Sequence, residues 1–232
     1  MFDERSAEPE FLDRPDFDPC LAARSYRFMG FVNRLLGGRR VVRQFVAAEM
    51  ESHPDRPLRI LDIGAGQCDI PLAVSRWARG RGRQVEFTCL EVSDTAFRLA
   101  GQKIARAGDS NVHVLKEDVW QHRPQRPYDW AVGSMFFHHL NNGQIVDLLR
   151  HLRPFVTEGV LINDLRRRAA VYAACAVLAA PLGREPRFDA LTSIRRGFRA
   201  DELRRLLETL EGVSVFARNA WVGRVAATVR FR

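Results

Sequence analysis

The sequence predicts an α/β protein with a Rossmann-like, seven-stranded, mostly parallel sheet and helices on both faces. Apolar runs typical of buried strands alternate with helical patterns, the first run ends in a glycine-rich turn, and the last two runs are joined by a link short enough for a hairpin. We therefore expect an antiparallel last strand. We also expect an N-terminal tail and helical cap in residues 1–57, and a main domain in residues 58–232 with a helical lid insertion at residues 166–198.

Two helical patterns precede the first strand. Residues 20–38 end at Gly37 and Gly38, which are typical helix stops, and residues 39–51 place their apolar side chains on one face. We expect both helices to pack over a pocket as a cap. The start of the chain is acidic and interrupted by prolines, so it does not resemble a signal peptide.

Residues 58–74 are the most informative segment of the chain. An apolar strand leads through Asp62 into the turn Gly64-Ala65-Gly66 and then directly into a helical pattern. Glycines at such a junction let the backbone approach a ligand, and the free N–H groups of the helix start point at it. A dinucleotide fingerprint needs a third glycine where Asp69 stands, and no lysine follows the turn as a phosphate loop requires. The segment predicts a nucleotide-type pocket and argues against NAD and against phosphoryl transfer.

Residues 61–68, reading LDIGAGQC, resemble motif I of the class I S-adenosylmethionine-dependent methyltransferases. Cys68 stands where the family pattern has its third glycine, and we expect this small residue to adopt ordinary right-handed helical angles. An acid at position 69 suits a ligand whose near end carries an ammonium and a sulfonium group. The resemblance implies S-adenosyl-L-methionine as cofactor and S-adenosyl-L-homocysteine as product.

Three further strands follow in the order that the resemblance requires, at residues 84–92, 112–115 and 128–134. The carboxyl ends of parallel strands meet in one crevice. In the family, an acid at the position of Glu91 accepts hydrogen bonds from the ribose hydroxyls, and an acid or amide at the position of Asp118 lies against the adenine amino group. The resemblance therefore implies cofactor contacts from Asp62, Gly64, Ala65, Gly66, Asp69, Glu91, Val92, Asp118, Val119 and Ser134.

The loop after the fourth strand carries the candidate catalytic residues, His138 and His139. Methyl transfer to a phenol or an activated carbon needs a base, and histidine titrates in the useful range. We expect one of the two to be that base, His138 in preference; the alternative is that both only pack and hold the loop. The [DN]-P-P-[YF] signature of amino-group methyltransferases is absent after this strand, which argues against methylation of nucleobase or glutamine amino groups.

An apolar segment at residues 169–182 follows three arginines. It is shorter than the roughly 20 residues that span a bilayer. We expect a hydrophobic lid over the substrate, with plain core packing and peripheral membrane contact as alternatives. Tyr172, Arg195 and Arg196 are the candidate substrate-binding residues, the arginines as partners of a carboxylate or enolate oxygen or, alternatively, as part of a solvated helix. A helix at residues 200–210 and two strands near the C-terminus complete the sheet.

Composition and charge narrow the class of protein. The net charge of +8 comes almost entirely from scattered arginines, a pattern closer to genome composition than to a phosphate-binding face, so the sequence argues against a nucleic-acid partner. The four widely spaced cysteines indicate free thiols in a reducing compartment rather than disulfides or structural zinc. We expect no metal site, no membrane span, a cytoplasmic location, and a monomer or homodimer.

The layout as a whole resembles small-molecule methyltransferases, including enzymes encoded beside polyketide synthases. The resemblance implies methyl transfer to oxygen or carbon of an apolar or aromatic small molecule, phenolic or polyketide-like. Two alternatives stay open at this point: an RNA or protein methyltransferase, and a non-catalytic binding module with the same fold.

Overall fold

Seven strands form one sheet at the centre of the molecule, and the structure, a computed structural model, describes residues 2–232. The strand order is β3-β2-β1-β4-β5-β7-β6; β7 runs antiparallel to both of its neighbours, and the other pairs are parallel. The strands are β1 (Leu58–Ile63), β2 (Val85–Leu90), β3 (Val112–Leu115), β4 (Tyr128–Ser134), β5 (Val156–Leu165), β6 (Val213–Ala220) and β7 (Arg224–Phe231). The predicted Rossmann-like architecture with an antiparallel last strand is confirmed.

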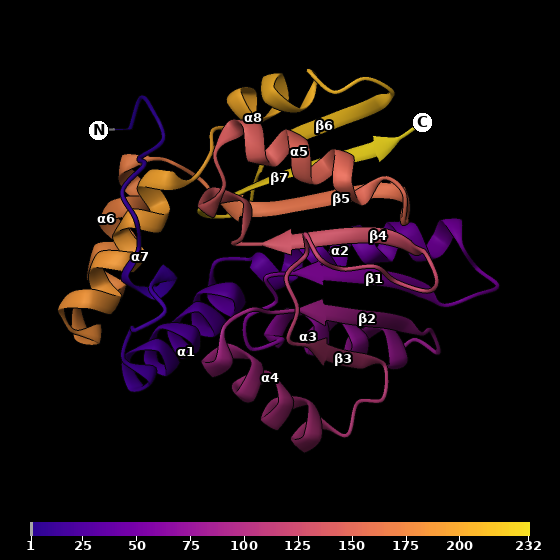
Figure 1. Cartoon of the computed structure of the whole chain (residues 1–232), viewed down its shortest axis with the longest axis horizontal. Helices are drawn as coiled ribbons and strands as arrows, with labels where there is room; N and C mark the ends of the chain where they lie inside the picture. The colour runs from indigo at the N-terminus through magenta and orange to yellow at the C-terminus, as the bar shows by residue number, and fades with distance from the viewer. Residues whose placement is uncertain (1) are drawn as a thin grey trace.

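Helices cover both faces of the sheet (Figure 1). The helices α2, α3 and α4 share one core with β1 and β2, to which they contribute Val42, Val74 and Ala100. The helices α5 and α8 build the core on the other face, around Leu148 and Leu203. The helices are α1 (Pro19–Leu35), α2 (Gly38–Ser52), α3 (Asp69–Arg79), α4 (Asp94–Ala107), α5 (Asn142–Leu152), α6 (Ala169–Leu178), α7 (Arg184–Arg196) and α8 (Ala200–Leu207), with short 3-10 helices η1 (Phe11–Asp13), η2 (Phe137–His139) and η3 (Ala180–Leu182).

The two helices before β1 have different roles. The expectation that both cap a pocket is wrong for α2, because its apolar stripe faces the sheet and its residues Val42 and Val46 are completely buried there. Gly37, which has a left-handed φ of +82°, separates the two helices. Only α1 therefore lies against the region where a pocket is expected.

A further group of elements lies beyond the carboxyl ends of the parallel strands: α1, α6, α7 and the N-terminal segment 2–18 (Figure 1). The apolar segment 169–182 forms α6 and η3 and packs on α7 and α1. Within α6, all of which is described, Cys175 alone is buried, and Val177 is 75% exposed. The helix is thus not a core helix, and one side of it faces outward. Among residues 2–232 the structure contains no helix long and apolar enough to cross a membrane.

Gly159 of β5 provides a test of the sheet packing. Its φ is +149°, and a Cβ atom there would lie 1.9 Å from the carbonyl oxygen of Val229 and 2.9 Å from the Trp130 ring. We expect Gly159→Ala to lower the free energy of unfolding by about 2–4 kcal/mol, because β7 must move away from β5.

Gly101→Ala is the matched control for this substitution, because a Cβ atom at Gly101 in α4 meets nothing within 4 Å. It should stabilise the protein by about 0.5–1 kcal/mol through helix propensity. Urea denaturation of both variants measures the difference. Equal stabilities would contradict the described contact between β5 and β7.

Candidate active site

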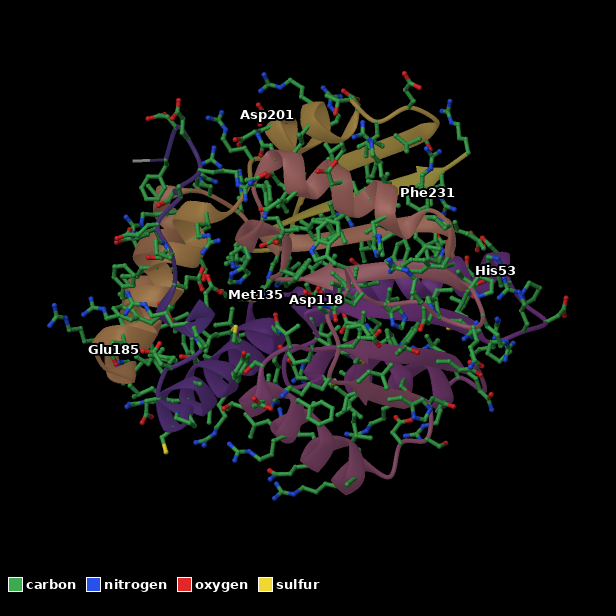
Figure 2. All side chains as sticks on the ribbon, in the orientation of Figure 1. His53, Asp118, Met135, Glu185, Asp201 and Phe231 are labelled. Carbon is green, nitrogen blue, oxygen red and sulfur yellow. The ribbon has the colours of Figure 1, made fainter. Side chains whose placement is uncertain are left out.

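A cleft opens at the carboxyl ends of β1, β2 and β4, bordered by α1 and the N-terminal segment. Its volume is about 720 Å³, within the range of roughly 300–1,000 Å³ usual for small-molecule sites. Figure 2 labels two of its lining residues, Asp118 and Met135, which both lie near the centre of the molecule in this view. Nine of the ten predicted cofactor contacts line this cleft: Gly64, Ala65, Gly66, Asp69, Glu91, Val92, Asp118, Val119 and Ser134.

The turn between β1 and α3 forms the floor of the cleft. Gly64, Gly66 and Cys68 all have left-handed backbone angles, with φ of +63°, +56° and +55°. The expectation of right-handed angles at Cys68 is therefore wrong: the position keeps the conformation that favours glycine, at a cost of about 1–2 kcal/mol for a residue with a Cβ atom. A Cβ atom at Gly64 would lie 2.5 Å from the Phe136 ring, so this glycine is also needed for close packing.

Glu91 connects the end of β2 to this turn. Its carboxylate accepts hydrogen bonds from the backbone N–H of Gly66 at 2.8 Å and of Ser93 at 2.9 Å, one on each oxygen. Burial raises the pKa of Glu91. Each oxygen keeps a lone pair for a further donor, so Glu91 combines two tasks, holding the glycine turn and offering a bidentate acceptor at the cleft wall.

Asp62, the tenth predicted contact, lies directly before the glycine turn and does not line the cleft. Its Oδ1 is buried and finds no hydrogen-bond partner among the described residues. Burial, together with the charges of Asp69 and Glu91, raises the pKa of Asp62 well above its usual range. An unsatisfied buried carboxyl group is costly. Because Asp62 does not line the cleft, its orphaned oxygen does not indicate a contact with a ligand there.

Asp69 is a further charged residue of the cleft lining. As the first residue of α3 it accepts hydrogen bonds from the side chains of Asn33 at 3.3 Å and Arg39 at 3.2 Å. Asp69 gives the cleft a carboxylate that suits an ammonium group; Asn33 also lines the cleft, whereas Arg39 does not. Together with the bidentate acceptor at Glu91, Asp69 and Asn33 fit S-adenosylmethionine. Neither Asn33 nor Arg39 is among the sequence-predicted contacts.

The two histidines on η2 have unequal access to the cleft. His139 lines it, whereas His138 does not and is only 2% exposed. The Nδ1 of His138 lies 2.7 Å from Asp164 Oδ1, and its Nε2 lies 3.6 Å from Glu10 Oε1. Burial disfavours the charged imidazole, but Asp164 and Glu10 outweigh this effect and raise the pKa of His138 to about 9. The geometry therefore favours His139 for contact with a ligand, because the tight 3-10 turn directs His138 toward β5.

The N-terminal segment closes the cleft on the side of η2. Asp13 lies 3.0 Å from His139 Nδ1, and Arg196 donates hydrogen bonds to the carbonyl oxygens of His138 and His139. Arg195 pairs with Glu8. These contacts engage both arginines within the protein.

Tyr172 packs edge-to-face against Phe2, with ring centroids 5.6 Å apart, and does not line the cleft. Glu10, Asp13 and Asp164 lie near the two histidines and are not among the site residues predicted from the sequence. Their partners lie more than 20 positions away in the chain, so no local motif indicates them.

A second, smaller cavity adjoins the cleft between α1, α6 and α7. It measures about 50 Å³ and shares Leu12, Met29 and Met135 with the cleft. Its lining is mostly apolar and includes Cys175 and Leu178 of α6. A cavity that takes up benzene measures about 150 Å³, so an aromatic group enters here only if the surrounding segments move.

Comparisons with known proteins agree with the fold. Residues 60–159 match the family model described as "Methyltransferase domain". No curated protein matches the chain. The solved structure of the plantazolicin methyltransferase BpumL in complex with SAH is similar with a TM-score of 0.70 at 16% identity, covering 96% of this chain and 92% of that chain. Magnesium protoporphyrin IX methyltransferase (ChlM) from Synechocystis PCC 6803 with bound SAH is similar with a TM-score of 0.61 at 14% identity, covering 90% and 92%. At such identities the likeness to these structures concerns the fold.

Proposed function

We propose that this chain, which carries a methyltransferase domain and is an S-adenosylmethionine-dependent methyltransferase, acts on an oxygen or carbon atom of an apolar small molecule. The main support for the proposal is that the predicted acidic and glycine positions line one cleft. The bound cofactor supplies an activated methyl group. The protein has to align the acceptor atom and, where the acceptor is weak, to assist the loss of its proton.

The charge of the cleft favours a small molecule over RNA. Among the described residues that line it, Arg14 is the only arginine or lysine, and the carboxylates are Asp13, Asp69, Glu91, Asp94, Glu117 and Asp118. A phosphate backbone entering this cleft would be repelled, whereas nucleic-acid sites are lined by cations. One of the structural neighbours reported above is named for magnesium protoporphyrin IX, a small molecule, which agrees with the proposal.

We assign the acceptor side of the site to the boundary between the cleft and the small apolar cavity. Met29 and Met135 line both, and His139 also lines the cleft. We place a phenolic or polyketide-like ring against the apolar lining, with its reacting atom toward His139. We assign the N-terminal segment and α6 as the parts that move to admit it, because the cavity itself is too small.

Glu91 provides the test of cofactor binding. Glu91→Ala removes the bidentate acceptor and releases the Gly66 N–H, so we expect binding of S-adenosylhomocysteine to weaken by about 2–4 kcal/mol. Glu86→Ala on the exposed side of the same strand is the control and should bind as the wild type does. Isothermal calorimetry measures both, and equal affinity in the Glu91 variant would remove the assignment.

Leu178 provides the test of the acceptor site. A panel of phenols is first screened for methyl transfer, and the KM is measured for a phenol that reacts. Leu178→Asp should raise this KM at least about 10-fold, because a carboxylate would enter the apolar lining of the small cavity. Val177→Asp changes the neighbouring but 75% exposed residue and should leave the KM unchanged. Both variants should keep the affinity for S-adenosylhomocysteine. Equal effects of the two substitutions, or transfer to protein or RNA but to no phenol in the panel, would contradict the proposed substrate class.

A further inference from the structure

Three side chains of metal-binding type meet beside the cleft. Glu10 comes from the N-terminal segment, and His138 and His139 come from η2; one ligand atom of each lies within 4.8 Å of the others. His139 lines the cleft and Glu10 lines the small apolar cavity, so the cluster lies where the two spaces adjoin. The sequence contains no recognisable ligand motif here because Glu10 is far from the histidines along the chain.

The outer contacts of these side chains orient them as metal ligands are oriented. The Nδ1 of His138 lies 2.7 Å from Asp164 Oδ1, and the Nδ1 of His139 lies 3.0 Å from Asp13 Oδ1. The hydroxyl of Ser193 donates a hydrogen bond to Glu10 Oε1 at 2.9 Å. Histidines that bind metals donate one ring nitrogen to a carboxylate or carbonyl in this way, which leaves the other nitrogen for the ion.

The Nε2 of His138 is the independent observation that indicates a ligand. It is buried, the side chain is 1% exposed, and among residues 2–232 it has no hydrogen-bond partner. Its nearest ion-pair atom, Glu10 Oε1, lies at 3.6 Å, which is too long for a hydrogen bond. Two ligands of a tetrahedral zinc ion with bonds of about 2.0–2.2 Å stand about 3.4 Å apart. The spacing therefore fits an ion between the two atoms.

We propose that Glu10, His138 and His139 bind one divalent transition-metal ion, with zinc as the best match. Two imidazoles and one carboxylate are a common zinc ligand set, and three protein ligands leave a fourth position open. Of the described cations nearby, Arg196 Nη1 lies 3.8 Å from Glu10 Oε1, so it competes with the ion for this carboxylate. Asp13, whose Oδ2 lies 3.1 Å from Arg196 Nη1, and Asp164, which pairs with His138 Nδ1, offset that charge. The proposal replaces the expectation, from the sequence, of no metal site.

The open position gives the ion a role in catalysis; this role, but not the site itself, rests on the proposed function. An acceptor hydroxyl bound there would lose its proton to water in the cleft more readily, since a metal ion lowers the pKa of a bound hydroxyl. The O–H bond would break, the oxygen anion would form a bond to the methyl carbon, and the carbon–sulfur bond of the cofactor would break with its electron pair staying on sulfur, giving S-adenosylhomocysteine. In this arrangement His139 acts as a ligand and does not accept the proton itself.

A second cluster of similar composition supplies a control. Glu49, His53 and Glu158 also bring one ligand atom each within 4.8 Å of the others. Both ring nitrogens of His53 are engaged, Nε2 with Glu158 Oε1 at 2.6 Å and Nδ1 with the carbonyl oxygen of Glu49 at 3.0 Å, so this histidine has no nitrogen left for an ion, although Glu49 Oε2 is without a partner among the described residues. In Figure 2 His53 lies toward the right edge, away from Met135 and the cleft.

The test is a calorimetric titration of the chelator-treated protein with Zn²⁺. The wild type should bind one ion tightly, and Glu10→Gln and His139→Gln should each weaken this binding at least about 100-fold. His53→Gln should have no effect. Titration with Co²⁺ should give an absorption spectrum typical of nitrogen and oxygen ligands, without a thiolate band. This result would show that the buried Cys68 and Cys89 do not bind the ion.

Each contrary result overturns a defined part of the proposal. A wild type without a tight stoichiometric site, or one whose site is lost only in His53→Gln, overturns the metal site. Unchanged methyl transfer by the zinc-free protein overturns the catalytic role of the ion. A protein that binds zinc and S-adenosylhomocysteine but methylates neither an oxygen nor a carbon acceptor of any apolar small molecule tested contradicts the proposed function but not the metal site.

Discussion

The parallel register of β2, β1, β4 and β5 is the constraint on which the rest of the structure depends. Ile63 at the end of β1 pairs with Leu90 at the end of β2 and with Gly133 in β4, and Ser134 pairs with Asn163 in β5. The chain therefore leaves all four strands at nearly the same level. The glycine turn, Glu91 and the η2 loop follow these strands, and Asp164 lies near the end of β5, so all four converge at this edge. A shift of one residue in any pair would turn the strand over and separate these groups.

A buried polar network closes this edge from above. His138, held between Asp164 of β5 and Glu10 of the N-terminal segment, joins the sheet to a segment that has no strand or long helix of its own. Arg196 fixes the two histidine carbonyls from α7. Buried charges of this kind contribute little net stability but strongly specify geometry, because every unpaired alternative is costly. The network positions the segment over the cleft, and metal binding would tighten it further.

The fold was predictable from the sequence because its signals are local. Strand patterns, the turn Gly64-Ala65-Gly66 and the acid at Glu91 each lie within a few residues of the feature they predict, and most of the predicted cofactor contacts share the cleft. The arrangement above the sheet was not predictable in the same way. The packing of α2 on the sheet and the burial of His138 depend on partners far along the chain. The left-handed angles at Cys68 depend on a turn geometry that outweighs the ordinary preference of a non-glycine residue.

We propose that the cleft at the carboxyl ends of β1, β2 and β4 binds S-adenosylmethionine. Backbone hydrogen exchange with and without saturating S-adenosylhomocysteine tests it most directly, because protection reports where a ligand stabilises the chain. With the ligand bound, we expect slower exchange in residues 64–69, 91–93 and 118–120, and no change in β6 at the far edge of the sheet. Unchanged exchange in those three segments, or protection confined to other parts of the molecule, would contradict it.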